Sequence, residues 1–183
     1  HYPLRRQRQM CIRDSPNVVT DFHEMGSQSS YFFEPMKANG SLDPIMPKDN
    51  YVKLNDLFAS YFSKSLDSIG SLYFTKEAFD GTYPGYGSSY PDLQGGLGLL
   101  FEQASSRGHK QKTKYGYITF PFTIRNQFVS SMATVQAAVE NKSTLRTYQK
   151  AFFKSALEKS AKSKIKAYTF FEKDQNKNKA FID

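Results

Sequence analysis

Apolar residues along this chain fall into short runs that alternate with helical periodicities, a pattern typical of an α/β protein. The segments at 16–24, 31–33 and 96–105 are apolar runs that predict buried strands. SLYFT at 71–75 predicts a further strand. Residues 50–68 carry apolar side chains at helical spacing, with one face turned to a core. The sequence therefore predicts a sheet covered by helices.

A second helical pattern begins near Ile124, breaks near Asn141 and resumes to about residue 162. Four apolar residues of its first half fall on one face: Phe128, Met132, Val135 and Val139. We expect residues 16–162 to form a partial three-layer α/β/α sandwich with a mixed, mostly parallel sheet. Residues 163–183 predict a short strand, a turn and the start of a helix, which we interpret as the beginning of another α/β domain. We expect the chain to be truncated at both ends.

Residues 1–15, HYPLRRQRQMCIRDS, have no apolar periodicity and resemble a translated sequencing adapter. We exclude them from fold reasoning as an artefact that is not native. They contain Cys11, so the rest of the chain has no thiol for a disulfide or a cysteine-based zinc site.

The formal net charge of +8 is unevenly distributed. Residues 16–140 hold ten Lys and Arg against twelve Asp and Glu, so the basic excess lies at the two ends of the chain. Because a phosphate backbone requires a basic surface, we expect no nucleic-acid partner. No run of eighteen apolar residues occurs, so we expect no membrane span.

The stretch DFHEM at 21–25 places a histidine beside a glutamate at the end of an apolar strand. The helical zinc-protease motif His-Glu-x-x-His is absent, because position 27 is Ser27. Glu102 likewise stands near the end of the apolar strand at 96–105. Ligands of open α/β sheets bind at the carboxyl ends of strands, so we expect His23 and Glu102 to belong to one site.

Five segments in order resemble the zinc carboxypeptidase family M14: DFHEMGS, YFF, YPGYGSS, LLFEQAS and FPFTIRNQF. The likeness covers roughly residues 16–150, the C-terminal half of that family's catalytic domain. It implies one Zn²⁺ ion with His23 as its third ligand, and Glu102 as the general base. It also implies that Tyr83, on a mobile loop, closes over a peptide substrate. Secretion or a periplasmic location follows from the resemblance alone.

The chemistry of these residue types agrees with the implied roles. Zinc binds nitrogen and carboxylate ligands and lowers the pKa of a bound water. A carboxylate off the metal can take the proton of that water and hand it to the leaving amine, as Glu102 would. Asp21 is placed to orient the imidazole of His23. Arg107 could reach a substrate carboxylate or face solvent.

The other two zinc ligands of the family come from an upstream His-x-x-Glu, and no such motif occurs in residues 16–183. We therefore expect the parent protein to be a zinc-dependent metallocarboxypeptidase-like hydrolase. We expect this chain alone to be inactive and to bind zinc weakly or not at all. Two alternatives stay open: an amidohydrolase of the same fold acting on acyl-amino acids or cell-wall peptides, and a non-catalytic peptide-binding module.

Overall fold

The structure is a computed structural model that describes residues 14–38, 41–43 and 45–182. Cys11 and nearly all of the predicted artefact at residues 1–15 lie outside the described residues. The chain divides into two compact units, with the division after Lys150. The first unit holds the sheet and the candidate site.

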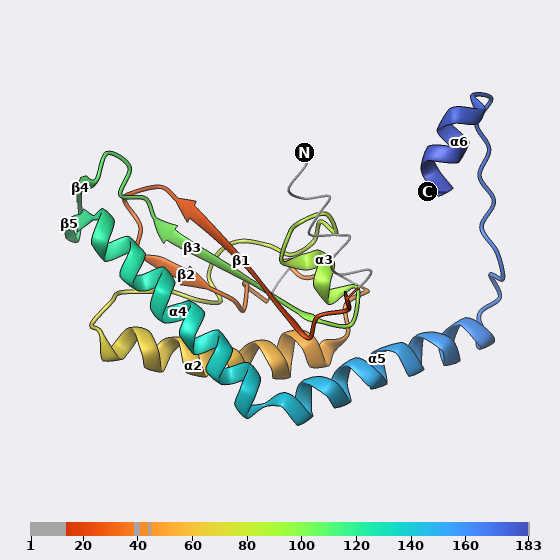
Figure 1. Cartoon of the computed structure of the whole chain (residues 1–183), viewed down its shortest axis with the longest axis horizontal. Helices are drawn as coiled ribbons and strands as arrows, with labels where there is room; N and C mark the ends of the chain where they lie inside the picture. The colour runs from red at the N-terminus through yellow and green to blue at the C-terminus, as the bar shows by residue number, and fades with distance from the viewer. Residues whose placement is uncertain (1–13, 39–40, 44, 183) are drawn as a thin grey trace. The chain divides into compact units, whose positions relative to one another are not determined.

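A three-stranded sheet forms the centre of the first unit (Figure 1). Strand β3 (Leu97–Ala104) lies between β1 (Val18–Met25) and β2 (Tyr31–Phe33). β1 pairs with β3 in parallel, whereas β2 pairs with β3 in antiparallel orientation. The predicted strands at these three segments and the mixed α/β class are therefore confirmed, and β2 and β3 are buried as expected, whereas β1 is only partly buried.

One face of the sheet packs on the helix α2 (Asn55–Ser68), which continues a π-helical turn, η1 (Asn50–Leu54). Phe62 of α2 is fully buried and meets Phe101 of β3 edge to face, with the ring centroids 4.9 Å apart. Phe22 of β1 stacks on the same Phe101 ring at 4.5 Å. The predicted helix over 50–68 and its core-facing side are confirmed.

The helix α4 (Phe120–Glu140) covers the same face but buries small and polar residues. Asn126 donates a hydrogen bond to Gln103 of β3 (2.9 Å), and the hydroxyls of Thr123 and Ser106 lie 3.0 Å apart. The opposite side of α4 is an exposed apolar stripe, which we define as Ile124, Phe128, Met132, Val135 and Val139. The predicted helical face of these residues is thus present, and it faces outward.

The first unit also contains a short helix, a two-stranded hairpin and an extended segment beside the sheet. A short helix, α3 (Ser89–Asp92), lies within the predicted loop at 81–96. A hairpin of β4 (Lys110–Thr113) and β5 (Gly116–Thr119) follows β3 and was not predicted. The predicted strand at 71–75 is wrong, because this segment makes only an isolated bridge between Phe74 and Phe32. Its aromatic side chains pack on the core while most of its backbone stays outside the sheet.

The helix α5 (Lys142–Lys162) runs across the division between the two units. The second unit also contains α6 (Gln175–Ile182), and Phe170 packs against Phe181 with the ring centroids 4.5 Å apart. The short strand predicted after residue 163 is wrong, since residues 164–172 form no strand. The domain boundary after residue 162 stays a prediction. In the part of the chain that the structure describes, no helix is long and apolar enough to cross a membrane.

Candidate functional site

The face of the sheet opposite α2 and α4 carries the candidate site. The parallel register of β1 and β3 sets His23 directly beside Glu102, and Asp21 beside Leu100. Because alternate residues of a strand share a face, all four side chains line one side of the sheet. Together with the loop 79–88 they enclose a pocket of about 440 Å³.

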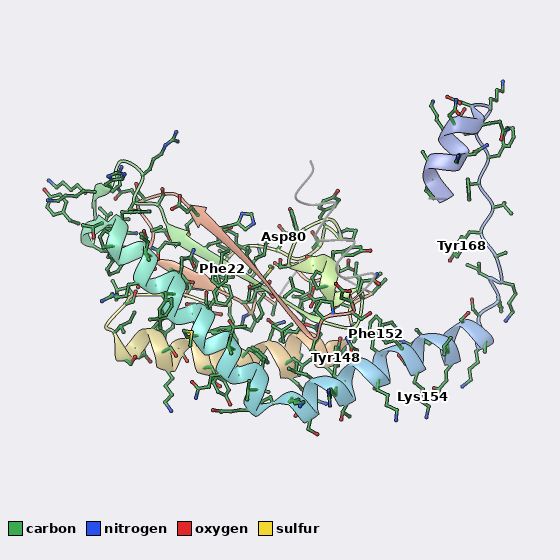
Figure 2. The ribbon with its side chains drawn as sticks, in the orientation of Figure 1. Phe22, Asp80, Tyr148, Phe152, Lys154 and Tyr168 are labelled. Carbon is green, nitrogen blue, oxygen red and sulfur yellow. The ribbon has the colours of Figure 1, made fainter. Side chains whose placement is uncertain are left out.

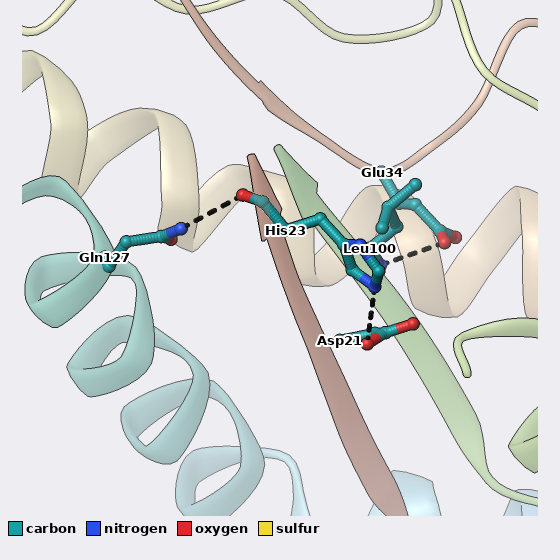
Figure 3. A network of polar contacts seen from close by, with 5 residues as sticks. All are labelled: Asp21, His23, Glu34, Leu100 and Gln127. Carbon is teal, nitrogen blue, oxygen red and sulfur yellow. Dashed lines mark hydrogen bonds and ion pairs between the residues drawn. The ribbon is translucent and has the colours of Figure 1, made fainter. Parts of the chain in front are cut away.

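The imidazole of His23 is held by a carboxylate on its own strand. Its Nε2 lies 3.0 Å from Oδ1 of Asp21 (Figure 3), and 54% of the His23 side chain is exposed. The carbonyl of His23 accepts a hydrogen bond from the Gln127 side chain at 3.3 Å, which ties β1 to α4. The Asp21 carboxylate packs so closely on Gly87 that a β-carbon there would collide with it. The contact between Nε2 of His23 and Oδ1 of Asp21 is the one that the predicted orienting role of Asp21 requires.

One carboxylate oxygen of Glu102, Oε2, is buried without a hydrogen-bond partner among the described residues. Only 9% of the residue is exposed. Burial raises the pKa of Glu102, and the charge of Asp21 raises it further, while His23 works in the opposite direction. A carboxyl of this kind takes and releases protons closer to neutral pH than an ordinary glutamate does.

Two more carboxyls lie beneath the pocket and were not foreseen from the sequence. Glu34 accepts a hydrogen bond from the backbone N–H of Leu100 at 3.0 Å (Figure 3), and Asp92 accepts from Gly98 N–H and from Asn50. Burial, assisted by the charge of Asp92, raises the pKa of Glu34 well above its usual range. Burial also raises the pKa of Asp92 to about 7. No sequence signal identifies these residues, because Asp and Glu are usually exposed.

Tyrosines from the glycine-rich loop form the rim of the pocket. Tyr83 and Tyr86 both line it and meet edge to face, with the ring centroids 5.2 Å apart. Both rings are more than two-fifths exposed. Gly85 lies directly against the ring of Tyr83, so a side chain at that position would displace it. The exposed rings of Tyr83 and Tyr86 have room to move, as a residue that closes over a substrate must.

Arg107 lies apart from the other predicted site residues. It stands in the turn between β3 and β4, where its backbone N–H donates to the Ser105 hydroxyl at 3.2 Å and its carbonyl accepts from the Gln111 amide. It does not line the pocket. The structure therefore brings together Asp21, His23, Tyr83 and Glu102, and leaves Arg107 outside.

The described residues do not by themselves fit a zinc ion. No group of three His, Cys, Asp or Glu side chains among them is arranged to hold a metal. Zinc sites in proteins use three or four protein ligands, and this pocket offers one imidazole, already bonded to Asp21. The expectation that this chain alone binds zinc weakly stays a prediction.

The chain matches no known protein-family model, no curated protein and no solved structure. The functional argument consequently depends on the geometry of the pocket and on the chemistry of its residues.

Proposed function

We propose that this chain supplies the general base and one imidazole of a metallocarboxypeptidase-like hydrolase that cleaves peptide or related amide bonds. The observation that carries the proposal is the pairing of His23 and Glu102 in one register position of two parallel strands, at the floor of one pocket. We also propose that the mixed sheet is part of the three-layer α/β/α sandwich of that family.

Glu102 has the properties of a proton carrier. The residue lines the pocket, and its raised pKa suits a base that accepts a proton from water and returns it to a leaving amine. General acid–base catalysis of this kind contributes about 10²–10⁴-fold to a reaction rate.

The other pocket residues position and cover the substrate. Asp21 fixes the His23 ring through the 3.0 Å contact, so that one ring nitrogen stays available to the pocket. Tyr83 and Tyr86 lie on a loop with three glycines between residues 81 and 87, which can swing over a bound peptide and exclude water. His23 would be one ligand of a zinc ion, and the described residues do not supply the other ligands that such a site needs.

The test of the proposal is the Glu102→Gln change in the full-length protein encoded by the source gene. We expect hydrolysis of a C-terminal peptide bond to fall by about 10²–10⁴-fold, with bound zinc unchanged, because the glutamine keeps the shape but cannot carry the proton. Hydrolysis that survives this change nearly unaltered would remove Glu102 from the mechanism. Binding of peptides without any cleavage by the unmutated protein would favour the peptide-binding module instead.

A second measurement concerns this chain alone. We expect a zinc titration monitored by the imidazole NMR signals to show no stoichiometric binding at micromolar concentration, since three protein ligands are not assembled. Stoichiometric micromolar binding that disappears in His23→Ala would show that the described residues are more complete than we infer.

A further inference from the structure

The exposed apolar stripe of α4 is a surface that the proposed hydrolysis does not use. Each of its five side chains is more than half exposed, and together they follow most of the length of the helix. Figure 2 shows α4 on the outside of the first unit. Single exposed apolar residues are normal on a protein, but a continuous row of them marks an interaction surface.

A groove lies beside the stripe, between α4 and the C-terminal part of α2. Its volume is about 430 Å³, and α2 contributes Ser65 and Ser68 to its wall, with Ile69 directly after the helix. Every stripe residue except Ile124 lines the groove as well. Helices pack by placing the side-chain ridges of one in the grooves of another. The surface therefore has the shape that a contact with a further helix requires.

The charges at the two ends of the stripe are opposite. Arg125 stands near its N-terminal end and Glu140 directly after its C-terminal end, both exposed, with no charged residue between them along the chain. Neither forms an ion pair among the described residues. The Arg125 guanidinium lies over the Phe122 ring at 4.8 Å. Glu140 accepts hydrogen bonds from Tyr61 and Gln136, at 2.7 and 2.8 Å. Both charges are therefore free to pair with a partner.

The two charged residues are placed almost symmetrically about Met132. Arg125 lies seven residues before it and Glu140 eight residues after it. At about 100° per residue, both fall on the same flank of the stripe. When two copies of α4 pack antiparallel around a twofold axis at Met132, Arg125 of each copy lies opposite Glu140 of the other. A parallel arrangement would place like charges together.

We propose that the α4 stripe is the interface of an antiparallel, twofold-symmetric homodimer of this chain. Phe128 of one copy then lies opposite Val135 and Gln136 of the other, which line the groove. The apolar contacts supply the attraction, and the two pairs of Arg125 with Glu140 set the orientation. A second copy is the occupant that the charge pattern favours, because a twofold interface must be complementary to itself. The candidate site takes no part, so this inference does not depend on the proposed function.

The dimer should be weak, because the interface is small. The stripe offers five residues per copy, whereas a standard interface has about 20–30 residues a side. We expect a Kd on the order of 10–100 µM, so the chain is mostly monomeric at the low micromolar concentrations of an unfolding titration. Sedimentation velocity of the intact 183-residue chain, from about 5 to about 500 µM, measures the Kd.

One substitution made at two places separates the stripe from the rest of the surface. Val135→Glu should raise the Kd by at least about tenfold, because it brings unpaired charge into an apolar contact. Val52→Glu is the matched control: Val52 lies on η1, outside the stripe, and is 62% exposed, compared with 57% for Val135. It should change the Kd by less than about twofold. Circular dichroism melting establishes that each variant is folded.

A charge exchange tests the predicted pairing across the axis. Arg125→Glu should weaken the dimer by about three- to tenfold, because two attractive pairs become repulsive. Adding Glu140→Arg to the same chain reverses both partners and should restore the Kd. A residue that acts only within its own copy would show no such rescue.

Cysteine cross-linking tests the orientation. In a chain that carries Cys11→Ser, Met132→Cys places one thiol on each side of the twofold axis, and a short bis-maleimide should join the two copies. Ile124→Cys should not cross-link, because a rise of about 1.5 Å per residue puts its two copies about 24 Å apart. A parallel dimer would cross-link at both positions.

Four results would overturn the inference: a monomer at about 500 µM, equal Kd values for Val135→Glu and Val52→Glu, no rescue by the charge exchange, or equal cross-linking at positions 124 and 132. A monomer would leave the stripe to a different occupant, such as a further segment of the parent protein. None of these measurements requires catalysis.

Discussion

The two faces of the β1–β3 sheet differ in what the same strands place on them. On the helix side, Phe22 and Phe101 stack in register and pack with the aromatic residues of α2 in the hydrophobic core. On the pocket side, the next residues along each strand are His23 and Glu102. The core face of the strands therefore stabilises the fold, and the pocket face carries the candidate site residues. We expect substitutions on the core face to lower the free energy of unfolding, and substitutions on the pocket face to change activity with little effect on stability.

The largest effect is expected for Phe62→Ala on the helix side. Phe62 is fully buried against Phe33, Phe58 and Phe101, and its removal leaves a cavity. We expect the free energy of unfolding to fall by about 3–5 kcal/mol in urea titrations. Phe128→Ala on the exposed stripe of α4 is the control and should change it by less than about 0.5 kcal/mol. Similar losses in both variants would mean that the stripe is part of the core.

The next effect is a pH dependence that originates beneath the pocket. Burial raises the pKa of Asp92 from 3.8 to about 7, so its contribution is fully favourable below about pH 4 and is lost as pH rises through 7. The free energy of unfolding should fall by at most about 4 kcal/mol between pH 4 and 7, since the two pKa values differ by about 3 and each pKa unit is worth about 1.4 kcal/mol.

Asp92→Asn should reduce this slope, because the amide oxygen can still accept from Asn50 and Gly98 but the charge is gone. Part of the slope should remain, because the pKa of Glu34 is also raised. Asp56→Asn removes a surface carboxylate paired with Lys76 and serves as the control. A slope that is unchanged in Asp92→Asn would contradict the assignment.

Gly98→Ala tests how closely β3 approaches the pocket loop. A β-carbon at Gly98 would overlap the backbone carbonyl of Ser88, which lines the pocket. Either the loop or the strand must shift, so we expect a loss of about 1–3 kcal/mol and amide shifts through residues 79–88. Wild-type stability together with an unchanged loop spectrum would show that the packing here is loose.

The smallest effect on stability is expected for Glu102→Gln. Removing the charge of a buried carboxyl whose pKa is raised should stabilise the chain slightly at neutral pH, because the glutamine amide brings no charge into the same position. Thermal melts at pH 5 and pH 7.5 measure it, and the gain should be larger at the higher pH. A destabilised variant would indicate a partner for Glu102 that the pocket geometry does not include.

Part of this architecture could be predicted from the sequence. The strands β1, β2 and β3 were predicted because each is an apolar run bounded by polar or turn-forming residues. The β4–β5 hairpin was missed because KQKT is polar throughout and gives no alternating pattern. The segment at 71–75 looked like a strand because Tyr73 and Phe74 are needed for packing, and packing alone does not pair a backbone.

The candidate site was only partly predictable, for a physical reason. His23 and Glu102 stand near the carboxyl ends of their strands, and parallel pairing brings such residues together. Asp21 lies two residues before His23, on the same face of β1. Glu34 and Asp92 gain their significance from burial, which depends on contacts far apart in the sequence. Arg107 was expected either to reach a substrate carboxylate or to face solvent, and the turn into the hairpin takes it away from the pocket.

The inverted side-chain distribution of α4 governs how the isolated chain should behave in the laboratory. The polar side of α4 forms hydrogen bonds with β3, whereas the exposed apolar stripe is in contact with water. An exposed apolar surface of this kind lowers solubility and binds hydrophobic dyes such as ANS. Lysine or glutamate in place of Val135 and Val139 should therefore improve yield and abolish dye uptake while leaving the pocket, on the far side of the sheet, undisturbed.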